Sequence, residues 1–241
     1  MTRELVRIER LSYNSGMMEL QYPPNIQLTT LQEEIPETTD FLRIAKRRCQ
    51  AVHPDGNLSA EFNVNTVMRG KEDAVAILAW KAPKSDPSVF LLSCLRPAPQ
   101  FRDFRACQLR EDAHVGNFYE IPAGMVELEE PGLEGLRAAA SRELYEEIGY
   151  AIPKERFQFL GSRIFSSPSI SAERIFFLHV EIKDDDAHVT PPGDGSPMEE
   201  GAKIINPKLS NVIDCLHRGY LPDAKTEIGL LRLSRLLQQT P

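Results

Sequence analysis

Cysteine is scarce in this 241-residue chain, and long apolar runs are missing. The four cysteines lie far apart, at Cys49, Cys94, Cys107 and Cys215. They form no C-x-x-C pair, so neither a metal knuckle nor a disulfide framework is indicated. No apolar run approaches the length of a membrane span, and the charged start of the chain contains no apolar signal segment. We therefore expect a reducing, cytoplasmic setting and no membrane partner.

The chain also lacks any extreme of composition. It is 41% hydrophobic and 26% charged, with one Trp, which argues against a disordered, collagen-like or disulfide-scaffold protein. The net charge is −7, from 35 acidic and 28 basic residues. A field of this sign repels polyanions, so we expect no nucleic-acid partner. A small phosphate compound can still bind where divalent cations and local Arg or Lys side chains offset the charge.

The pattern divides the chain into an N-terminal extension, residues 1–70, and a larger domain, residues 71–241. Within the extension we expect two short strands before residue 23. Thr38–Asp40 then predicts the cap of a short helix that runs through Arg48.

The larger domain mixes strands and helices. Apolar runs predict strands at 73–80, 88–95, 118–121, 157–165 and 174–182, and helical spacing predicts helices at 133–148, 207–218 and 223–238. Residues 184–198 are rich in Asp, Pro and Gly, which predicts a mobile loop. Strands interleaved with few helices indicate an α/β sandwich with a mixed sheet.

The most informative segment is Gly124–Tyr150, which contains seven glutamates. On a helix, Glu143 and Glu147 lie about 40° apart, with Glu146 about 60° to the other side of Glu143. Three carboxylates on one edge repel one another unless a cation lies between them. Hard oxygen ligands without a nearby His or Cys favour Mg²⁺ or Mn²⁺ over zinc. The alternative is an ordinary solvated acidic face.

The flanking residues favour the metal site, because they resemble the Nudix box. That motif reads Gly, five residues, Glu, seven residues, Arg-Glu, an apolar residue, one residue, Glu-Glu, one residue, Gly and an apolar residue. Glu134, followed after seven residues by Arg142–Tyr150, matches its fixed positions. Nine residues rather than five separate Gly124 from Glu134. We expect the four additional residues to lengthen the loop before the helix.

Other segments resemble the ADP-ribose pyrophosphatase branch of that family, over roughly residues 65–235. They are Leu95–Pro97, Tyr119–Gly124, Ser166–Arg174, Glu199–Gly201 and Asp223–Thr226. Two positions depart from the branch: Cys94-Leu95 replaces a Gln–aromatic pair, and Ser169 replaces a Gly. The resemblance implies a Nudix-type α/β/α sandwich. In this branch an N-terminal sheet helps to form a homodimer, which we expect of residues 1–70.

The resemblance also implies the site residues. The metal ligands would be Glu143, Glu147 and the backbone carbonyl of Ala123, with Glu146 as a second candidate. Glu200 would be the general base that deprotonates the attacking water, with Glu199 and then Glu146 as alternatives. Arg96 would grip phosphate, Glu173 would accept from ribose hydroxyls, and Arg69 is a further substrate contact. Arg142 would orient its neighbours. Alternatively, it forms only a structural ion pair with the glutamates.

The reaction so implied is hydrolysis of the pyrophosphate bond of a nucleoside diphosphate compound, with Mg²⁺ or Mn²⁺. ADP-ribose, cleaved to AMP and ribose 5-phosphate, is the leading substrate, and a UDP- or ADP-sugar is the alternative. A non-catalytic nucleotide-binding sensor ranks lower, because Glu143 and Glu147 are both present.

Overall fold

The structure, a computed structural model, describes residues 27–35, 42–83, 85–101, 103–106, 116–193 and 202–239. The chain forms two compact units. One contains the residues up to Glu33 together with Arg47–Val64, and the other contains Glu34–Lys46 and Asn65–Pro241. The two strands expected before residue 23 lie outside the described residues.

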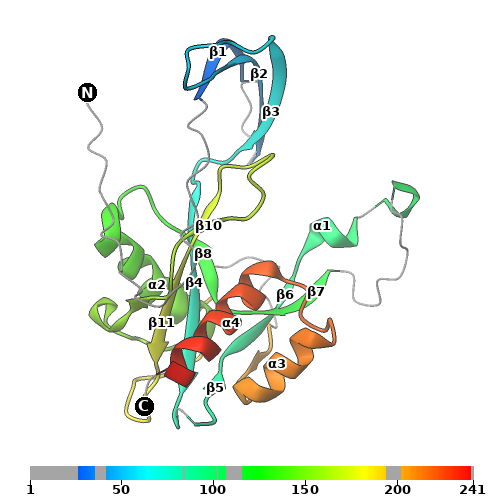
Figure 1. The fold of residues 1–241 in the computed structure, drawn as a ribbon. Coiled ribbons are helices and arrows are strands. Elements are labelled where there is room, and N and C mark those ends of the chain that lie inside the picture. The colour runs from blue at the N-terminus through cyan, green and yellow to red at the C-terminus, as the bar shows by residue number, and fades with distance from the viewer. Residues whose placement is uncertain are drawn as a thin grey trace. The chain divides into compact units, whose positions relative to one another are not determined.

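The N-terminal sheet has three strands, in the order β1-β2-β3 (Figure 1). Their bounds are Gln27–Glu34, Arg43–Val52 and Phe62–Met68. The helix expected to run through Arg48 is therefore wrong, and its proposed cap lies outside the described residues. In β2, Ala45 and Cys49 are buried whereas Ile44 and Lys46 are exposed, which is the period of two that a strand requires. Pairing with strands on both sides outweighs the local helical pattern.

The main sheet has six strands and is mixed, as the sequence predicted. Its path is β10-β11-β4-β5, and β8 also pairs with β4 and β9 with β11. The bounds are β4 Asp73–Lys81, β5 Ser88–Val89, β8 Ala123–Met125, β9 Gln158–Phe159, β10 Ile164–Phe165 and β11 Arg174–Glu181. β4 and β11 run parallel, from Asp73 opposite Arg174 to Trp80 opposite Glu181. Residues 157–165, expected as one strand, form the two short strands β9 and β10.

A second antiparallel sheet has the order β12-β6-β7. Its strands are β6 Leu91–Leu95, β7 Asn117–Glu120 and β12 Ile204–Ile205. The stretch 88–95, expected as one strand, is therefore divided at Phe90 between two sheets. Short helical turns follow β6 and precede β9: α1 Pro97–Gln100, η1 Phe104–Ala106 and η2 Lys154–Arg156.

Helices cover both faces of the main sheet and complete the expected three-layer sandwich (Figure 1). They are α2 Gly132–Ile148, α3 Leu209–His217 and α4 Ala224–Gln239. Alternate residues of the buried strand β4 serve the two cores. Val75 and Ile77 pack with Leu144 of α2, whereas Ala76 and Leu78 pack with Leu230 of α4. Truncating either leucine to alanine would cost about 2–5 kcal/mol.

The C-terminal end of α2 is fixed by a glycine. Gly149 has φ 80°, and its N–H donates to the Tyr145 carbonyl. A Cβ at this position would lie 2.0 Å from the Val189 carbonyl oxygen, so the residue must be glycine both for its conformation and for its close neighbour. Further along, the Gly193 N–H donates to the Glu146 carbonyl at 3.0 Å. The described part of the expected mobile loop therefore runs along the end of the acidic helix.

Within the described ranges, no helix combines the length and the apolar character needed to cross a membrane. Cys49, Cys94 and Cys215 are free thiols, and Cys107 lies outside the described residues. The cytoplasmic setting stays a prediction.

Candidate active site

A cavity of about 930 Å³ lies in the larger unit, between α2, the ends of β4, β8 and β10, and the start of α4. Its volume falls within the roughly 300–1,000 Å³ that is usual for small-molecule sites. The predicted site residues that line it are Arg69, Arg96, Ala123, Glu143, Glu146, Glu147 and Glu173. The structure thus brings together every predicted site residue that it describes. Glu199 and Glu200 lie outside the described residues.

One wall of the cavity is the acidic edge of α2, formed by Glu143, Glu146 and Glu147. The backbone of β8 packs directly against it. A Cβ on Gly124 would lie 1.9 Å from the carboxyl carbon of Glu143, so only glycine leaves room for this carboxylate. The Ala123 N–H donates to Oε2 of Glu147 at 2.9 Å. These contacts explain why the motif begins with a glycine and why Ala123 lies beside the predicted metal ligands.

The donors on this wall suit a hard divalent cation. They are carboxylates and peptide groups, and neither His nor Cys occurs among the described residues that line the cavity, which favours Mg²⁺ or Mn²⁺. In the described part of the chain, no three His, Cys, Asp or Glu side chains are already drawn together as metal ligands. The donor chemistry therefore fits the metal, while Arg142 and the β8 backbone hold the carboxylates in this structure.

Arg142 binds several of the groups at the acidic edge of α2. Its Nη1 donates to Oε1 of Glu143 at 2.7 Å and to Oε2 of Glu146 at 3.4 Å. Its Nη2 donates to the Met125 carbonyl at 3.0 Å and to Oε2 of Glu130 at 3.2 Å. Both the orienting role and the ion pair that the sequence suggested are thus compatible with its contacts. One guanidinium offsets only one of the three negative charges on the edge, so a further cation would still be stabilised there.

Glu130 changes the account of the motif spacing. Five residues separate it from Gly124, as the motif requires of its first Glu, and its carboxylate binds Arg142. Glu134 is instead 61% exposed and pairs with Arg137 and Lys154. We therefore assign the first Glu to Glu130. On this assignment the four additional residues lie after Glu130, where α2 begins at once, and not in the loop before the helix as the first count implied.

A second part of the wall contains two predicted substrate contacts that bind each other. Arg69 Nη1 donates to Oε1 of Glu173, and the Ser166 hydroxyl donates to Oε2 at 3.0 Å. Phe165, 48% exposed, lines the cavity beside them. This part of the site therefore offers a carboxylate, a guanidinium, a hydroxyl and an aromatic face.

A third part joins the predicted phosphate contact Arg96 to three residues that were given no role from the sequence, Glu120, Asp223 and Lys225. Nε and Nη2 of Arg96 donate to Oε1 and Oε2 of Glu120 at 2.8 and 2.5 Å. Lys225 Nζ donates to the same Oε2 and, at 3.0 Å, to Oδ2 of Asp223. Burial would raise the pKa of Glu120, but the hydrogen bonds from Arg96 and the charge of Lys225 outweigh it and hold the pKa below its ordinary value. One clue to Glu120 was present in the sequence. It is the charged residue of the predicted strand 118–121, whose other residues are aromatic or aliphatic.

The cysteine beside this network is shielded rather than activated. Burial, reinforced by the negative charge of Glu120, raises the pKa of the Cys94 thiol to about 12. A thiol with such a pKa carries almost no thiolate at neutral pH and is a poor nucleophile. Cys94 therefore contributes no chemistry to the cavity.

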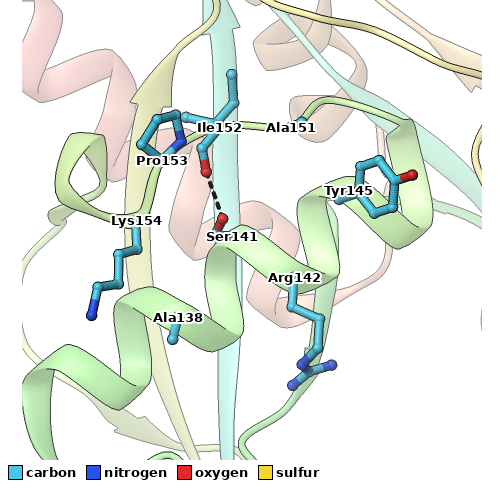
Figure 2. Close-up of a pocket in the computed structure, with 8 residues that line it drawn as sticks. All are labelled: Ala138, Ser141, Arg142, Tyr145, Ala151, Ile152, Pro153 and Lys154. Carbon is cyan, nitrogen blue, oxygen red and sulfur yellow. Dashed lines mark hydrogen bonds between the residues drawn. The ribbon is translucent and has the colours of Figure 1, made fainter.

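The outer side of α2 carries a separate, shallow hollow of about 700 Å³ (Figure 2). Its lining residues are Ala138, Ser141, Arg142, Tyr145, Ala151, Ile152, Pro153 and Lys154. The Ser141 hydroxyl donates to the Ile152 carbonyl at 2.5 Å, which ties the helix to the following loop. Arg142 lines both hollows, but the acidic edge and Arg96 line only the larger one, so we place the chemistry there.

Comparison with known proteins agrees with this arrangement. Residues 103–208 match the family model of the NUDIX domain. The crystal structure of an ADP compounds hydrolase is similar, with a TM-score of 0.63 and 16% identity over 92% of this chain and 97% of that one. A C. elegans Ap4A hydrolase binary complex gives a TM-score of 0.38 and 16% identity over 68% of this chain and 98% of that one. No curated protein matches significantly in sequence. At such identities the first structure shows a shared fold, and the second adds nothing to it.

Proposed function

Because this chain belongs to the Nudix hydrolases, we propose that it cleaves the pyrophosphate bond of a nucleoside diphosphate linked to a second group, with ADP-ribose as the favoured substrate. The products would be AMP and ribose 5-phosphate. The observation that carries the proposal is the single cavity that joins the acidic edge of α2 to separate cationic contacts at Arg96 and Arg69. Such a cavity can hold a metal and a diphosphate together.

The charges in the cavity explain why a metal is needed. Six carboxylates line it, those of Glu127, Glu143, Glu146, Glu147, Glu173 and Asp223, against the four cations Arg69, Arg96, Arg142 and Lys225. At the acidic edge of α2 this excess of negative charge would repel a phosphate unless divalent cations offset it. Nudix hydrolases use a divalent metal ion. Here Glu143, Glu147 and the Ala123 carbonyl would hold it, and Glu146 is a second candidate ligand. Once bound, the metal would polarise the phosphoryl group and offset the charge of the leaving phosphate.

The protein's own groups would do the rest. Arg142 holds Glu143 and Glu146 in place. Glu200 is our candidate base for the attacking water. Arg96 would grip a phosphate, and the Glu173 carboxylate would accept from ribose hydroxyls. The same contacts could serve a UDP- or ADP-sugar, which is the second candidate substrate class.

A hydrolysis panel tests the proposal. The full chain would be assayed with Mg²⁺ on ADP-ribose, NADH, UDP-glucose, ADP-glucose and dinucleoside polyphosphates. We expect the highest kcat/KM on ADP-ribose, with AMP among the products. A preference for UDP-glucose or ADP-glucose would favour the sugar diphosphatase. Binding without turnover of any compound would favour the non-catalytic sensor.

Replacing one metal ligand tests the acidic edge. We expect Glu147→Gln to lower kcat at least ~100-fold, the scale of losing a key charge stabiliser, while the melting temperature changes little because the side chains are nearly isosteric. The matched control is Glu134→Gln, the same change at an exposed position of the same helix, which should keep nearly full activity. Near-normal rates for Glu147→Gln would move the metal site elsewhere.

We also propose that the N-terminal sheet joins two copies of the chain. Large apolar side chains are exposed on it, among them Leu28 at 57%, Leu58 at 59% and Phe62 at 39%. Contiguous exposed apolar patches mark protein contacts, and we propose that these side chains form such a patch at the contact between the two copies. Light scattering should give the mass of a dimer, and Leu28→Gln combined with Leu58→Gln should shift it toward the monomer. A wild-type mass of one chain at micromolar concentration would contradict the dimer.

A further inference from the structure

Two cations of the cavity share one buried anion, Glu120. We propose that Glu120 is a positioning residue, which holds Arg96 and Lys225 side by side as a paired contact for a phosphate group of the substrate, separate from the metal ligands. The inference rests on the proposed function, which it extends to a second, metal-independent phosphate contact.

The three residues come from three elements that meet at this point. Glu120 ends β7 and is 1% exposed. Arg96 directly follows β6, the antiparallel partner of β7. Lys225 lies in the first turn of α4. Both carboxylate oxygens of Glu120 accept hydrogen bonds from these cations, so the anion fixes where both charged groups lie.

The start of α4 is fastened at the same place. Asp223 Oδ2 accepts from the N–H of Thr226 at 2.9 Å and from its hydroxyl at 2.6 Å, which caps the helix. The Thr226 hydroxyl, fully buried, accepts in turn from the N–H of Ile121 at 3.0 Å. The residue after Glu120 is thus bonded to the residue after Lys225. The ammonium therefore has little freedom, and its side chain is only 14% exposed.

The pair keeps donors for a ligand. An arginine has five N–H donors and a lysine has three. The contacts with Glu120 involve Nε and Nη2 of Arg96 and leave Nη1 out of the pair. Those of Lys225 with Glu120 and Asp223 account for two of its three N–H groups. Both cations line the cavity, so the remaining donors can reach phosphate oxygens there.

Charge separates this contact from the acidic edge of α2. Arg96 and Lys225 are balanced by Glu120 and Asp223, so the group is formally neutral and does not repel a phosphate. The edge of Glu143, Glu146 and Glu147 does repel one until a metal is bound. The paired cations are therefore the part of the cavity that can grip a phosphate when no metal is present.

An ion-pair network with a purely structural role would not need to line the cavity. Well-packed apolar residues commonly replace buried ion pairs without loss of stability, and a structural pair need not face the cavity. The Arg156–Asp186 pair is such a case. Asp186 is 11% exposed and accepts from both Nη atoms of Arg156, but neither residue lines the cavity. Asp186→Asn is therefore the matched control for Glu120→Gln.

The first test separates KM from kcat at saturating Mg²⁺. We expect Glu120→Gln to raise the KM for ADP-ribose about tenfold or more, the scale of a lost hydrogen bond to a charged group. Its kcat should change by less than about threefold, because the contact acts alike in the ground and transition states. Asp186→Asn should leave both constants near wild type. A lower kcat with unchanged KM in Glu120→Gln would reduce Glu120 to a structural residue.

Two further measurements keep the inference testable if Glu120→Gln folds poorly or no panel compound is hydrolysed. Lys225→Met, which keeps the Arg96–Glu120 pair, should also raise KM. In calorimetry with chelator present, wild type should bind ADP-ribose and Glu120→Gln should bind it about tenfold more weakly. Glu143→Gln should bind at least as well as wild type, because it removes a repelling charge. Equal affinities of wild type and Glu120→Gln, or no wild-type binding without metal, would overturn the inference even if ADP-ribose is hydrolysed.

Discussion

Removal of divalent cations is expected to abolish the hydrolysis of ADP-ribose by this chain. Without metal, the carboxylates of Glu143, Glu146 and Glu147 face the phosphates, and Arg142 contributes a single positive charge beside them. Two unit charges about 4 Å apart interact by roughly 4 kcal/mol near a protein surface, and each 1.36 kcal/mol is a tenfold change in rate. A single uncompensated charge at that distance would therefore slow turnover by roughly a thousandfold.

The measurement is the rate of AMP release after exhaustive dialysis against a chelator, followed by addition of one metal at a time. Mg²⁺ and Mn²⁺ should restore activity, because the donors on the acidic edge are oxygens. An unchanged melting temperature after dialysis would show that the loss is not due to unfolding. Full turnover without any divalent cation would contradict the metal site.

Glu200→Gln is expected to lower kcat by ~100- to 10,000-fold, the usual cost of losing a general base. KM should stay nearly unchanged, because the lost group acts in the transition state. Glu200 lies outside the described residues, but the chain on either side of its segment is placed. Gly193 lines the cavity and is bonded to the Glu146 carbonyl, and the Lys203 N–H donates to the Ser93 hydroxyl at 2.8 Å. Gly193, the last described residue before Glu200, therefore lies on the cavity wall beside the acidic helix.

Glu199→Gln is the internal control for this experiment, since it makes the same change one residue earlier. It should be mild if Glu200 is the base. If Glu199→Gln is the damaging change and Glu200→Gln the mild one, the assignment is off by one residue. If both changes are mild, the base lies on α2, and Glu146 is the next candidate.

The parts of the molecule that the sequence predicted well are those with local signals. The helix around Glu143 has both its apolar spacing and its motif within one short segment, and its predicted start differs from the observed one by a single residue. β4 reads as an apolar run because helices cover both of its faces. The long-range pairing of β4 with β11 has no such local signature, although both strands were predicted.

The failures have the opposite cause. The stretch up to Arg48 has a helical pattern, but pairing within a sheet decides its conformation. Glu120 lies in a segment that the resemblance covers, but its role was not predicted because its partners, Arg96 and Lys225, are 24 and 105 positions away. Glu134 was taken as the first Glu of the motif because the spacing was counted back from Arg142. The hydrogen bonds between Glu130 and Arg142, which the sequence does not show, identify Glu130 instead.

The place of the four additional residues sets a rule for changes in length near the site. A helix completes a turn in 3.6 residues, so adding or deleting four residues between Glu130 and Arg142 rotates the downstream part by only about 40°. Adding or deleting two would rotate it by about 200° and carry Glu143 away from Gly124, onto the outer side of α2 where Ser141 and Tyr145 now lie. The first turns of α2 can therefore change in length only by nearly whole helical turns. In a library of designed insertions there, we expect activity to be retained at insertion lengths that are close to multiples of three to four residues and to be lost between them.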